Sequence, residues 1–359
     1  MENITYGILV INPGSTSTKI ALFENERLIF KEKVNHSTEE LEGYENIMAQ
    51  HSFRRNLILQ VLRDKNVDEF KIKAVVGRGG LIKPVEGGTY LVNEKMLDHL
   101  KHGLLGEHAS NLGGILVYEI GRELDVPAYV VDPPVVDEMD PIAKITGLPE
   151  IKRRSVFHAL NQKAVARKVA EVLGKKYEEL NLIIAHLGGG ITVGAHNQGQ
   201  VVNVNNALDG EGPFSPERVG ELPAKGLANL IFSKGFTFDE VKKLLAGKGG
   251  LVAHFGTNDA QAIRKRIEEG DETAKLVFEA MAYQVAREIG ACAAVLSGRV
   301  DAVVLTGGLA HEEGFVEWIK ERVAFIAQVF IFPGEHELKA LAQGDLRVLT
   351  GQEKPKEYS

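Results

Sequence analysis

Residues 8–26 read ILVINPGSTSTKIALFENE, and this stretch decides the fold. An apolar run of the composition typical of a buried strand ends at Asn12, and a second apolar run follows a short hydroxyl-rich segment. The pattern predicts a β-hairpin whose turn carries Ser15 and Ser17 and closes with Lys19. Such a turn can bind phosphate, because glycine lets backbone N–H groups approach and hydroxyls add donors. Taken alone, the same pattern is also typical of an ordinary turn.

A second copy of the pattern lies about half a chain later. Residues 182–200 read LIIAHLGGGITVGAHNQGQ and align with the first stretch without a gap, so that Asn12 falls on His186. Both copies continue into a third apolar strand. The repeat predicts two similar domains, each opening with a β-meander. Two such turns facing each other across a cleft could clamp the phosphates of a nucleotide, the second turn with Gly188, Gly189 and Gly190.

Composition narrows the class of protein. The chain has 359 residues and a net charge of −7, and no basic cluster points to nucleic acid as a partner. The single cysteine, Cys292, excludes an intrachain disulfide and a multi-cysteine zinc site, and it is expected to be an inert core thiol. The first residues lack a signal-peptide pattern, and no apolar run approaches the length of a membrane span. These features predict a cytoplasmic protein with no membrane partner.

Strands alternate with helices along the chain, which predicts an α/β fold. We expect an N-terminal domain over residues 1–155 and a C-terminal domain over 156–341, with residues 342–359 packing back on the first. The end of the chain, residues 354–359, is expected to fray. A glycine- and proline-rich loop over 205–223 is long enough to suggest a site.

Polar residues at predicted strand ends are the candidates for chemistry. The sequence contains no Walker A motif, no dinucleotide-binding glycine fingerprint, no HExxH and no GxSxG. In open α/β sheets, ligands bind beyond the carboxyl ends of the strands. The polar residues at such ends or in glycine-rich loops are Asn12, Arg78, His108, Asp132, His186 and Arg218.

Each candidate has a plainer interpretation beside the functional one. An arginine is usually a solvated surface residue, but Arg78 lies between glycines after a buried strand, which favours a binding role. A histidine at a strand end is often structural, yet His186 precedes three glycines. Asp132 could be a turn residue, and it is also the best candidate for a Mg²⁺ ligand, since Mg²⁺ typically takes one or two carboxylates plus phosphate oxygens.

These residues and motifs resemble the superfamily of acetate and sugar kinases, heat-shock chaperones and actin, and VINPGSTSTK resembles the opening motif of its acetate and butyrate kinase family. The resemblance implies two actin-like, ribonuclease H-like domains around a nucleotide cleft. HLGGGITVGAH is similar to the family's phosphate loop, which implies that His186 contacts the transferred phosphoryl group. EGPFSPERVGELP and GEHASNLGG are similar to segments that imply a catalytic Arg218 and an active-site His108. Asp132 falls where the family has its catalytic aspartate.

The resemblance also implies ATP or ADP and Mg²⁺ as cofactors. NDAQ lies where the ribose would bind, which implies roles for Asp259, Ala260 and Gln261. TGGLAHEEGF is similar to the family's adenine-side motif, which implies that Gly307 and Gly308 flank the adenosine. GEHEL matches the segment with the Mg²⁺-site glutamate, and both Glu335 and Glu337 are candidates.

Three segments, GRGGLIKPVEGG, VDPPVVDE and FPGEHELKALAQGDLRVL, resemble butyrate kinases more than acetate kinases. They imply transfer of the ATP γ-phosphoryl group to butyrate or a related short- or branched-chain fatty acid, by a homodimer or higher homo-oligomer. Gly77, Gly79 and Gly80 suggest an acyl pocket with room for methylenes, or else a backbone turn. The alternative function is an ATP-driven conformational module of the chaperone or actin type, which needs no second substrate.

Overall fold

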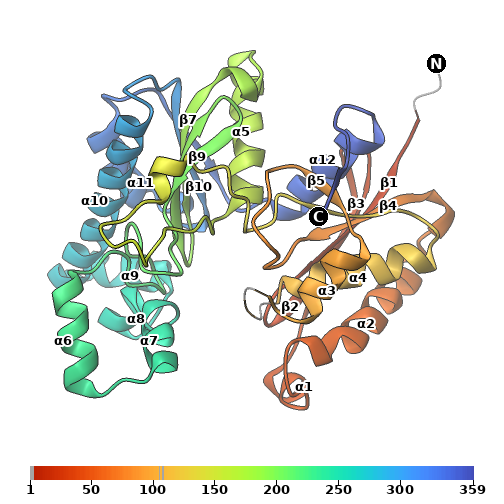
Figure 1. Ribbon diagram of the computed structural model, residues 1–359, viewed down its shortest axis with the longest axis horizontal. Helices are drawn as coiled ribbons and strands as arrows, with labels where there is room; N and C mark the ends of the chain where they lie inside the picture. The colour runs from red at the N-terminus through yellow and green to blue at the C-terminus, as the bar shows by residue number, and fades with distance from the viewer. Residues whose placement is uncertain (1–3, 105, 107–108) are drawn as a thin grey trace. The chain divides into compact units, whose positions relative to one another are not determined.

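The computed structural model describes residues 4–104, 106 and 109–359. The chain divides into two compact units (Figure 1). The first unit comprises Met1–Val136 together with His336–Ser359, and the second unit is Asp137–Glu335. Each unit contains one sheet, and each sheet includes a three-stranded antiparallel meander, as the sequence repeat predicted.

The first unit is built on a seven-stranded mixed sheet with the order β12-β5-β6-β4-β1-β2-β3. Its strands are β1 (Gly7–Pro13), β2 (Ser17–Glu24), β3 (Arg27–Asn35), β4 (Ile72–Arg78), β5 (Thr89–Leu91), β6 (Ala128–Val131) and β12 (Lys356–Glu357). Its helices are α1 (Thr38–Glu42), α2 (His51–Asp64), α3 (Glu94–Lys101), α4 (Asn111–Glu123) and α12 (Glu337–Leu349). Strands β1, β4 and β6 are parallel neighbours.

Helices cover both faces of the central strands of the first unit. Helices α4 and α12 each pack against β1, β4 and β6. Every residue of β1 is therefore buried, which explains its unbroken apolar run. Close packing demands small residues at these contacts: a Cβ on Gly344 of α12 would come within 2.5 Å of the Val131 side chain.

The second unit is built on a five-stranded sheet with the order β11-β10-β7-β8-β9. Its strands are β7 (Asn181–Leu187), β8 (Ile191–Asn197), β9 (Gln200–Val204), β10 (Ala302–Gly307) and β11 (Val329–Pro333). Its helices are α5 (Ala159–Leu173), α6 (Ala224–Lys234), α7 (Phe238–Leu245), α8 (Gly250–Phe255), α9 (Ala260–Glu268), α10 (Glu272–Val295) and α11 (Glu313–Val323). Gly174 ends α5 in the left-handed conformation, which glycine adopts without a steric penalty.

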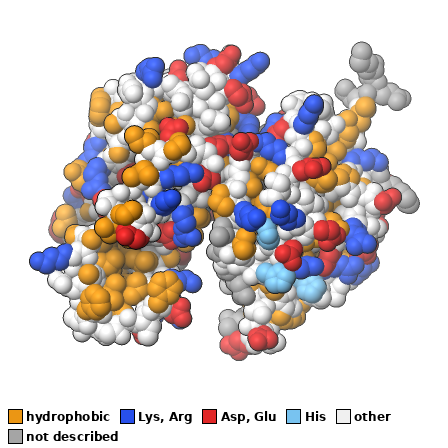
Figure 2. Space-filling model, viewed as in Figure 1, with side chains coloured by type: hydrophobic (Ala, Val, Ile, Leu, Met, Phe, Trp, Pro, Cys, Tyr) orange, Lys and Arg blue, Asp and Glu red, His pale blue; other side chains and the backbone are white. Residues whose placement is uncertain are grey.

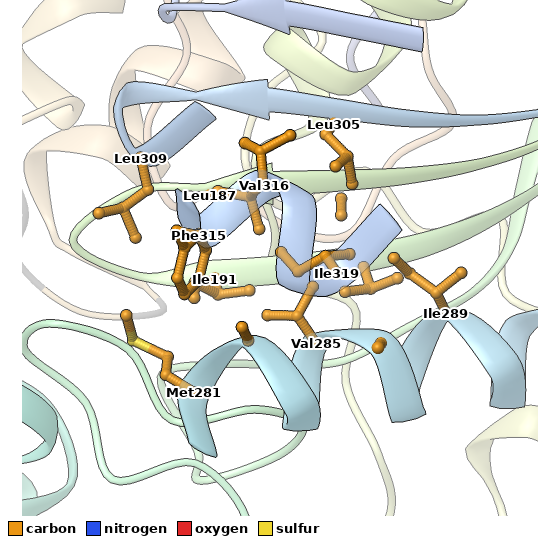
Figure 3. Close-up of a cluster of buried hydrophobic side chains, with 14 of the residues drawn as sticks. Leu187, Ile191, Met281, Val285, Ile289, Leu305, Leu309, Phe315, Val316 and Ile319 are labelled. Carbon is orange, nitrogen blue, oxygen red and sulfur yellow. The ribbon is translucent and has the colours of Figure 1, made fainter. Parts of the chain in front are cut away.

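The core of the second unit lies between its sheet and the long helix α10. Figure 3 shows side chains of α10 and α11 meeting those of the strands, and the labelled residues are Leu187, Ile191, Met281, Val285, Ile289, Leu305, Leu309, Phe315, Val316 and Ile319. Cys292 is fully buried in the same core, and burial raises the pKa of its thiol. The thiol therefore stays protonated, consistent with the inert role predicted for it.

The two meanders differ by one residue in their first turn. In the first unit Pro13 pairs with Thr18, which leaves four turn residues, whereas Leu187 pairs with Ile191 in the second and leaves three. The gap-free alignment is therefore correct for the first strand of each copy and wrong for the second. In register, His186 pairs with Thr192, as Asn12 pairs with Lys19.

The unit boundaries fall at other residues than the sequence suggested. The chain passes into the second unit after Val136, not near residue 155, because the segment that follows is bound to β9 and α5. The buried Glu138 accepts from Lys163 of α5 at 2.9 Å, and Asp140 N donates to Val202 O at 3.0 Å. The return to the first unit comes at His336, before α12, since that whole helix packs on the first sheet.

Local structure departs from the sequence expectations at several points. Helix α12 runs across residue 341, at which we expected the second domain to end. The end of the chain is ordered, contrary to the predicted fraying. Strand β12 pairs with β5, and the buried Tyr358 hydroxyl accepts from Lys83 N at 2.9 Å.

The surface carries apolar side chains over one part of the second unit. Figure 2 shows hydrophobic side chains gathered over the region of α6, α7 and α8. Phe232 is 86% exposed and Phe238 is 79% exposed. None of the helices within the described residues is long and apolar enough to pass through a membrane.

A buried arginine, Arg54, supports the first turn through hydrogen bonds. Arg54 of α2 is fully buried, and its guanidinium donates to the carbonyl oxygens of Gly14 at 2.8 Å, Ser15 at 3.0 Å and Ser17 at 3.3 Å. Gln50 accepts from the same group at 2.8 and 3.1 Å. A single side chain thus donates hydrogen bonds to three carbonyls of the turn.

We expect Arg54→Met to lower the free energy of unfolding by about 2–4 kcal/mol, because the buried Gln50 and the part-buried turn carbonyls lose hydrogen bonds from a charged donor. Arg55→Met is the matched control: Arg55 is the adjacent residue, it pairs with Glu119 and Glu123 on the surface, and its loss should cost about 1 kcal/mol or less. Urea unfolding of both variants measures the difference. Equal midpoints for the two variants would contradict the role given to Arg54.

A second buried polar group lies in α12. Asp345 is fully buried, and neither carboxyl oxygen has a hydrogen-bond partner among the described residues. Burial raises the pKa of Asp345 from 3.8 to about 8, so the folded protein holds this carboxyl protonated near neutral pH. Tyr129 of β6 lies close enough for the charge of Asp345 to raise its pKa further, after burial.

Because the folded state keeps a proton that the unfolded state releases above about pH 4, stability should fall as pH rises from about 4 to 8. The slope from this group reaches up to about 1.4 kcal/mol per pH unit. Asp345→Asn should remove this pH dependence. The melting temperature of the variant, relative to that of the wild type, should therefore increase as pH rises. Asp64→Asn, on the exposed end of α2, is the control. A difference that does not change with pH would refute the protonated state of Asp345.

Candidate active site

Three parallel strands of the first unit end at candidate residues. Asn12 ends the apolar run of β1, Arg78 ends β4, and Asp132 follows β6 directly. Ile11 is in register with Gly77, and Arg78 with Val131, so the three side chains leave neighbouring strands at one edge. This is the edge at which ligands bind in α/β sheets.

A carboxylate of α12 joins two of these residues. Glu337 Oε2 accepts from Asn12 Nδ2 at 2.6 Å, and Oε1 accepts from Arg78 Nη1 at 2.8 Å. Lys19 Nζ lies 4.0 Å from the same carboxylate. The Glu337 side chain is only 14% exposed, which strengthens these charge-assisted bonds. Of the two metal candidates, Glu337 is thus the one in this cluster, whereas Glu335 is exposed and ends the second unit.

Asp132 occupies a strained backbone conformation. Its φ is +39°, a left-handed value that costs a non-glycine residue of order 1 kcal/mol or more. The side chain is 2% exposed, and Oδ1 accepts from Gly88 N at 2.7 Å. Strain of this kind is concentrated at functional sites, which favours the functional interpretation over that of a turn residue.

The glycines beside Arg78 serve packing, not an acyl pocket. A Cβ on Gly77 would lie 2.7 Å from Val117 Cγ1, and one on Gly80 would lie 2.3 Å from Asn111 Oδ1, both residues of α4. A Cβ on Gly79 would lie 2.9 Å from Pro133. The space beside each glycine is therefore filled by the protein itself, and the predicted room for methylenes at these positions is wrong.

In the second unit, His186 at the end of β7 is held by residues of α5. His186 Nδ1 lies 2.7 Å from Asn161 Oδ1, and its ring stacks on that of His158 with centroids 3.8 Å apart. A Cβ on Gly188 would lie 3.0 Å from His186 Nε2, so this ring nitrogen faces the glycine turn. His186 is 2% exposed.

The long loop 205–223 brings Arg218 to the same turn. A Cβ on Gly190 would lie 2.3 Å from Arg218 Nη1, so only glycine lets the guanidinium lie there. Ser215 Oγ donates to Gly189 O at 2.6 Å and fastens the loop to the turn. Burial lowers the pKa of Arg218, while the charge of Glu217 opposes that shift. Because the reference pKa of arginine is far above 7, the Arg218 guanidinium remains a cation near neutral pH.

The predicted nucleotide residues are more dispersed. Asp259 is the exposed N-cap of α9 and accepts from Gln261 N at 2.9 Å, which a capping role alone explains, and Ala260 begins the helix. Gly307 has a φ of +91°, and a Cβ there would lie 2.4 Å from Leu187 O. Gly308 next to it faces open space. Ser15 is exposed on the first turn, and Ser17 begins β2. His108 lies outside the described residues.

Sequence reasoning missed three residues that hold these sites. Arg54 follows the spacing of the buried Ile58 and Leu62, so a cation on an apolar helical stripe was its available signal. Asn161 and His158 stand at the start of α5 in the segment FHALNQ, and only a polar cluster at a helix start marked them.

Comparisons with known proteins identify the family and the fold of the chain. Residues 149–343 match the model of the acetokinase family. The structure resembles the acetate kinase of Porphyromonas gingivalis, with a TM-score of 0.80 and 20% identity over 96% of this chain and 100% of that one. A propionate kinase of Francisella tularensis gives a TM-score of 0.76 and 19% identity over 94% of this chain and 98% of that one.

A more distant likeness extends the fold class. A transcriptional regulator of the ROK family, a homologue of the Escherichia coli MLC protein, gives a TM-score of 0.52 and 13% identity over 97% of this chain and 80% of that one. These likenesses confirm the predicted α/β fold with two actin-like units. Because the family model covers more than half of its length, the chain belongs to the acetokinase family.

Proposed function

We propose that this protein is a butyrate kinase, which transfers the γ-phosphoryl group of ATP to butyrate or a related short- or branched-chain fatty acid and yields an acyl phosphate and ADP. Family membership supports a carboxylate kinase over an ATP-driven conformational module. The single observation that carries the proposal is the cluster at the ends of β1 and β4, where Arg78 and Asn12 are fastened by Glu337.

This cluster suits a reaction that needs no general base. A fatty acid, like a glutamate side chain, is already ionised at pH 7. The difficulty is to bring an anionic nucleophile to an anionic phosphate, so catalysis comes from positioning and electrostatics. In our proposal Arg78 binds the carboxylate, and Asn12, Lys19 and the hydroxyls of Ser15 and Ser17 donate to phosphate oxygens. The resemblance to the family adds a catalytic role for His108.

The second unit supplies donors for the phosphoryl group. His186 Nε2 and the Arg218 guanidinium both lie at the turn of Gly188, Gly189 and Gly190. Their charge would stabilise the equatorial oxygens in the transition state, where negative charge is spread over them. The adenosine would lie by Gly307 and Gly308, with the ribose near Asp259, Ala260 and Gln261.

Asp132 and Glu337 are the residues proposed to hold Mg²⁺. The described residues include no group of three or more metal-binding side chains, which fits an ion that takes one or two carboxylates and completes its shell with water and phosphate. Glu337 Oε1 and Oε2 each accept a hydrogen bond in the cluster described above, and a carboxylate oxygen offers two lone pairs. When bound, the ion supplies neutralisation of the phosphate charge.

The preference for butyrate rests on the three segments that are similar to butyrate kinases. The glycines beside Arg78 do not support it, because packing explains them. A homodimer also remains a proposal, and exposed phenylalanines such as Phe232 and Phe238 would suit one.

Arg218→Ala should lower kcat by about 10³-fold or more, on the scale of arginine residues that stabilise phosphoryl-transfer transition states. Steady-state rates of ADP formation measure it. Arg287→Ala is the control, because Arg287 pairs with Glu221 on the surface. A near-normal kcat would remove Arg218 from the site.

Asp132→Asn should shift the Mg²⁺ activation curve to higher concentration, because one carboxylate ligand is lost. Asparagine can still accept from Gly88 N and tolerates the left-handed conformation, so the melting temperature should change little. An unchanged activation curve at unchanged stability would make Asp132 a structural residue.

Comparison of kcat/KM for acetate, propionate, butyrate and isobutyrate tests the substrate. Two further buried methylenes contribute about 1.6 kcal/mol, so butyrate or isobutyrate should exceed acetate by roughly tenfold. ADP formation without any acid should be slow. Equal values, or a preference for acetate, would refute the butyrate assignment and leave the carboxylate kinase intact.

A further inference from the structure

We propose that Asn161 is a positioning residue that fixes the imidazole proton of His186 on Nδ1, so that Nε2 donates to a phosphoryl oxygen only when the ring is protonated. The inference rests on the proposed function, in which His186 contacts the transferred phosphoryl group. It adds that His186 is positively charged when it contacts the phosphoryl group, and that Asn161 of α5 positions its ring.

The orientation of the Asn161 amide follows from its second partner. Asn161 lies 2.8 Å from the backbone oxygen of Glu335, which can only accept, so its NH₂ group must face that oxygen. The amide oxygen therefore faces His186 Nδ1, at 2.7 Å. Since an amide oxygen can only accept, Nδ1 must carry the proton. Asn161 is 3% exposed, so water does not compete for these bonds.

A proton on Nδ1 decides what Nε2 can do. In the neutral ring one nitrogen is a donor and the other an acceptor, so neutral His186 presents an acceptor at Nε2. Nε2 is the atom that faces Gly188 in the phosphate turn. Phosphoryl oxygens are acceptors too, and two facing acceptors repel each other. Only the imidazolium form, with both nitrogens protonated, can donate to the phosphoryl group.

We assign the positive charge to His186 and not to the stacked ring of His158. His158 stacks on it at 3.8 Å with an angle of 11° between the planes, and two imidazolium rings so close would repel each other. Gln162 Nε2 lies 3.0 Å from both the backbone oxygen and the hydroxyl of Thr192, so the amide donates there. The hydroxyl keeps its own proton to give to His158 Nδ1, at 2.9 Å. His158 can thus stay neutral with its proton on Nε2.

The charged groups that the described contacts bring near the ring come from the glycine turn. The turn brings the Arg218 cation and the Glu217 carboxylate close to Gly190 and Gly189. On the adjoining strands, Thr192 and Thr306 pair with His186 and carry no charge. The start of α5 contributes His158 and Asn161. The hydrogen bond that Nδ1 donates to Asn161 Oδ1 is therefore a direct polar restraint on the position of the ring proton.

Ring ¹⁵N NMR of histidine-labelled protein tests the proposal without turnover. At a pH where the ring is neutral, wild-type His186 should show a protonated Nδ1 and an acceptor Nε2. Asn161→Ala should shift the proton toward Nε2, so that the neutral ring can donate to the phosphoryl group and the alkaline loss of kcat becomes weaker. Because the ring also loses the bond that orients it, kcat at its optimum should fall about tenfold, with KM for the fatty acid nearly unchanged. Asn161→Asp keeps an acceptor, so the Nδ1 proton should remain, and a carboxylate beside the ring should carry the alkaline loss of kcat to higher pH.

Asn93→Ala is the matched control, because Asn93 also makes two hydrogen bonds, one from Met96 N and one to Tyr358 O, in the other unit. It should leave the His186 spectrum and kcat unchanged. A neutral wild-type ring with its proton on Nε2, or an Asn161→Ala spectrum identical to the wild type, would overturn the proposal. If no fatty acid supports ADP formation, the proposed function fails, while the spectra still decide where the proton lies.

Discussion

The Glu337 carboxylate is the interaction on which the first site depends. Asn12 and Arg78 come from neighbouring strands of the sheet, β1 and β4, and Glu337, which is distant from both in the sequence, accepts a hydrogen bond from each. The carboxylate lies at the start of α12, whose packing against β1, β4 and β6 sets its position. Without this buried anion, Arg78 would lose its bonded partner and its orientation. The return of the chain to the first unit therefore places Glu337 in the proposed site.

The fold could be predicted largely from the sequence because its strongest signals are local and repeated. Buried parallel strands read as unbroken apolar runs, and the repeated meander revealed two related units. Details that depend on partners distant in sequence could not be predicted. The boundary after Val136 is decided by the buried pair of Glu138 and Lys163, and Tyr358 is ordered by contacts with α3 and Lys83.

The site was predicted as residue types at strand ends, and the structure brings together Asn12, Arg78 and Glu337 in one unit and His186, Arg218 and the glycine turn in the other. The supporting residues escaped prediction, since burial of Arg54 and the amide orientation of Asn161 are visible only in three dimensions. The glycines beside Arg78 were predicted to make room for a ligand. In the structure they let α4 approach closely instead. Glycine marks a tight contact, and the sequence alone does not name the contacting group.

The central claim is that a fatty acid oxygen attacks the γ-phosphorus of ATP, and isotope transfer tests it most directly. Butyrate labelled with ¹⁸O in both carboxyl oxygens would be incubated with ATP, Mg²⁺, the protein and hydroxylamine, which attacks the acyl carbon of any acyl phosphate and releases inorganic phosphate. The account predicts one ¹⁸O atom in each released phosphate, seen as an isotope shift by ³¹P NMR, with butyryl hydroxamate formed in equal amount. Phosphate free of ¹⁸O would show that water is the nucleophile and would contradict the account.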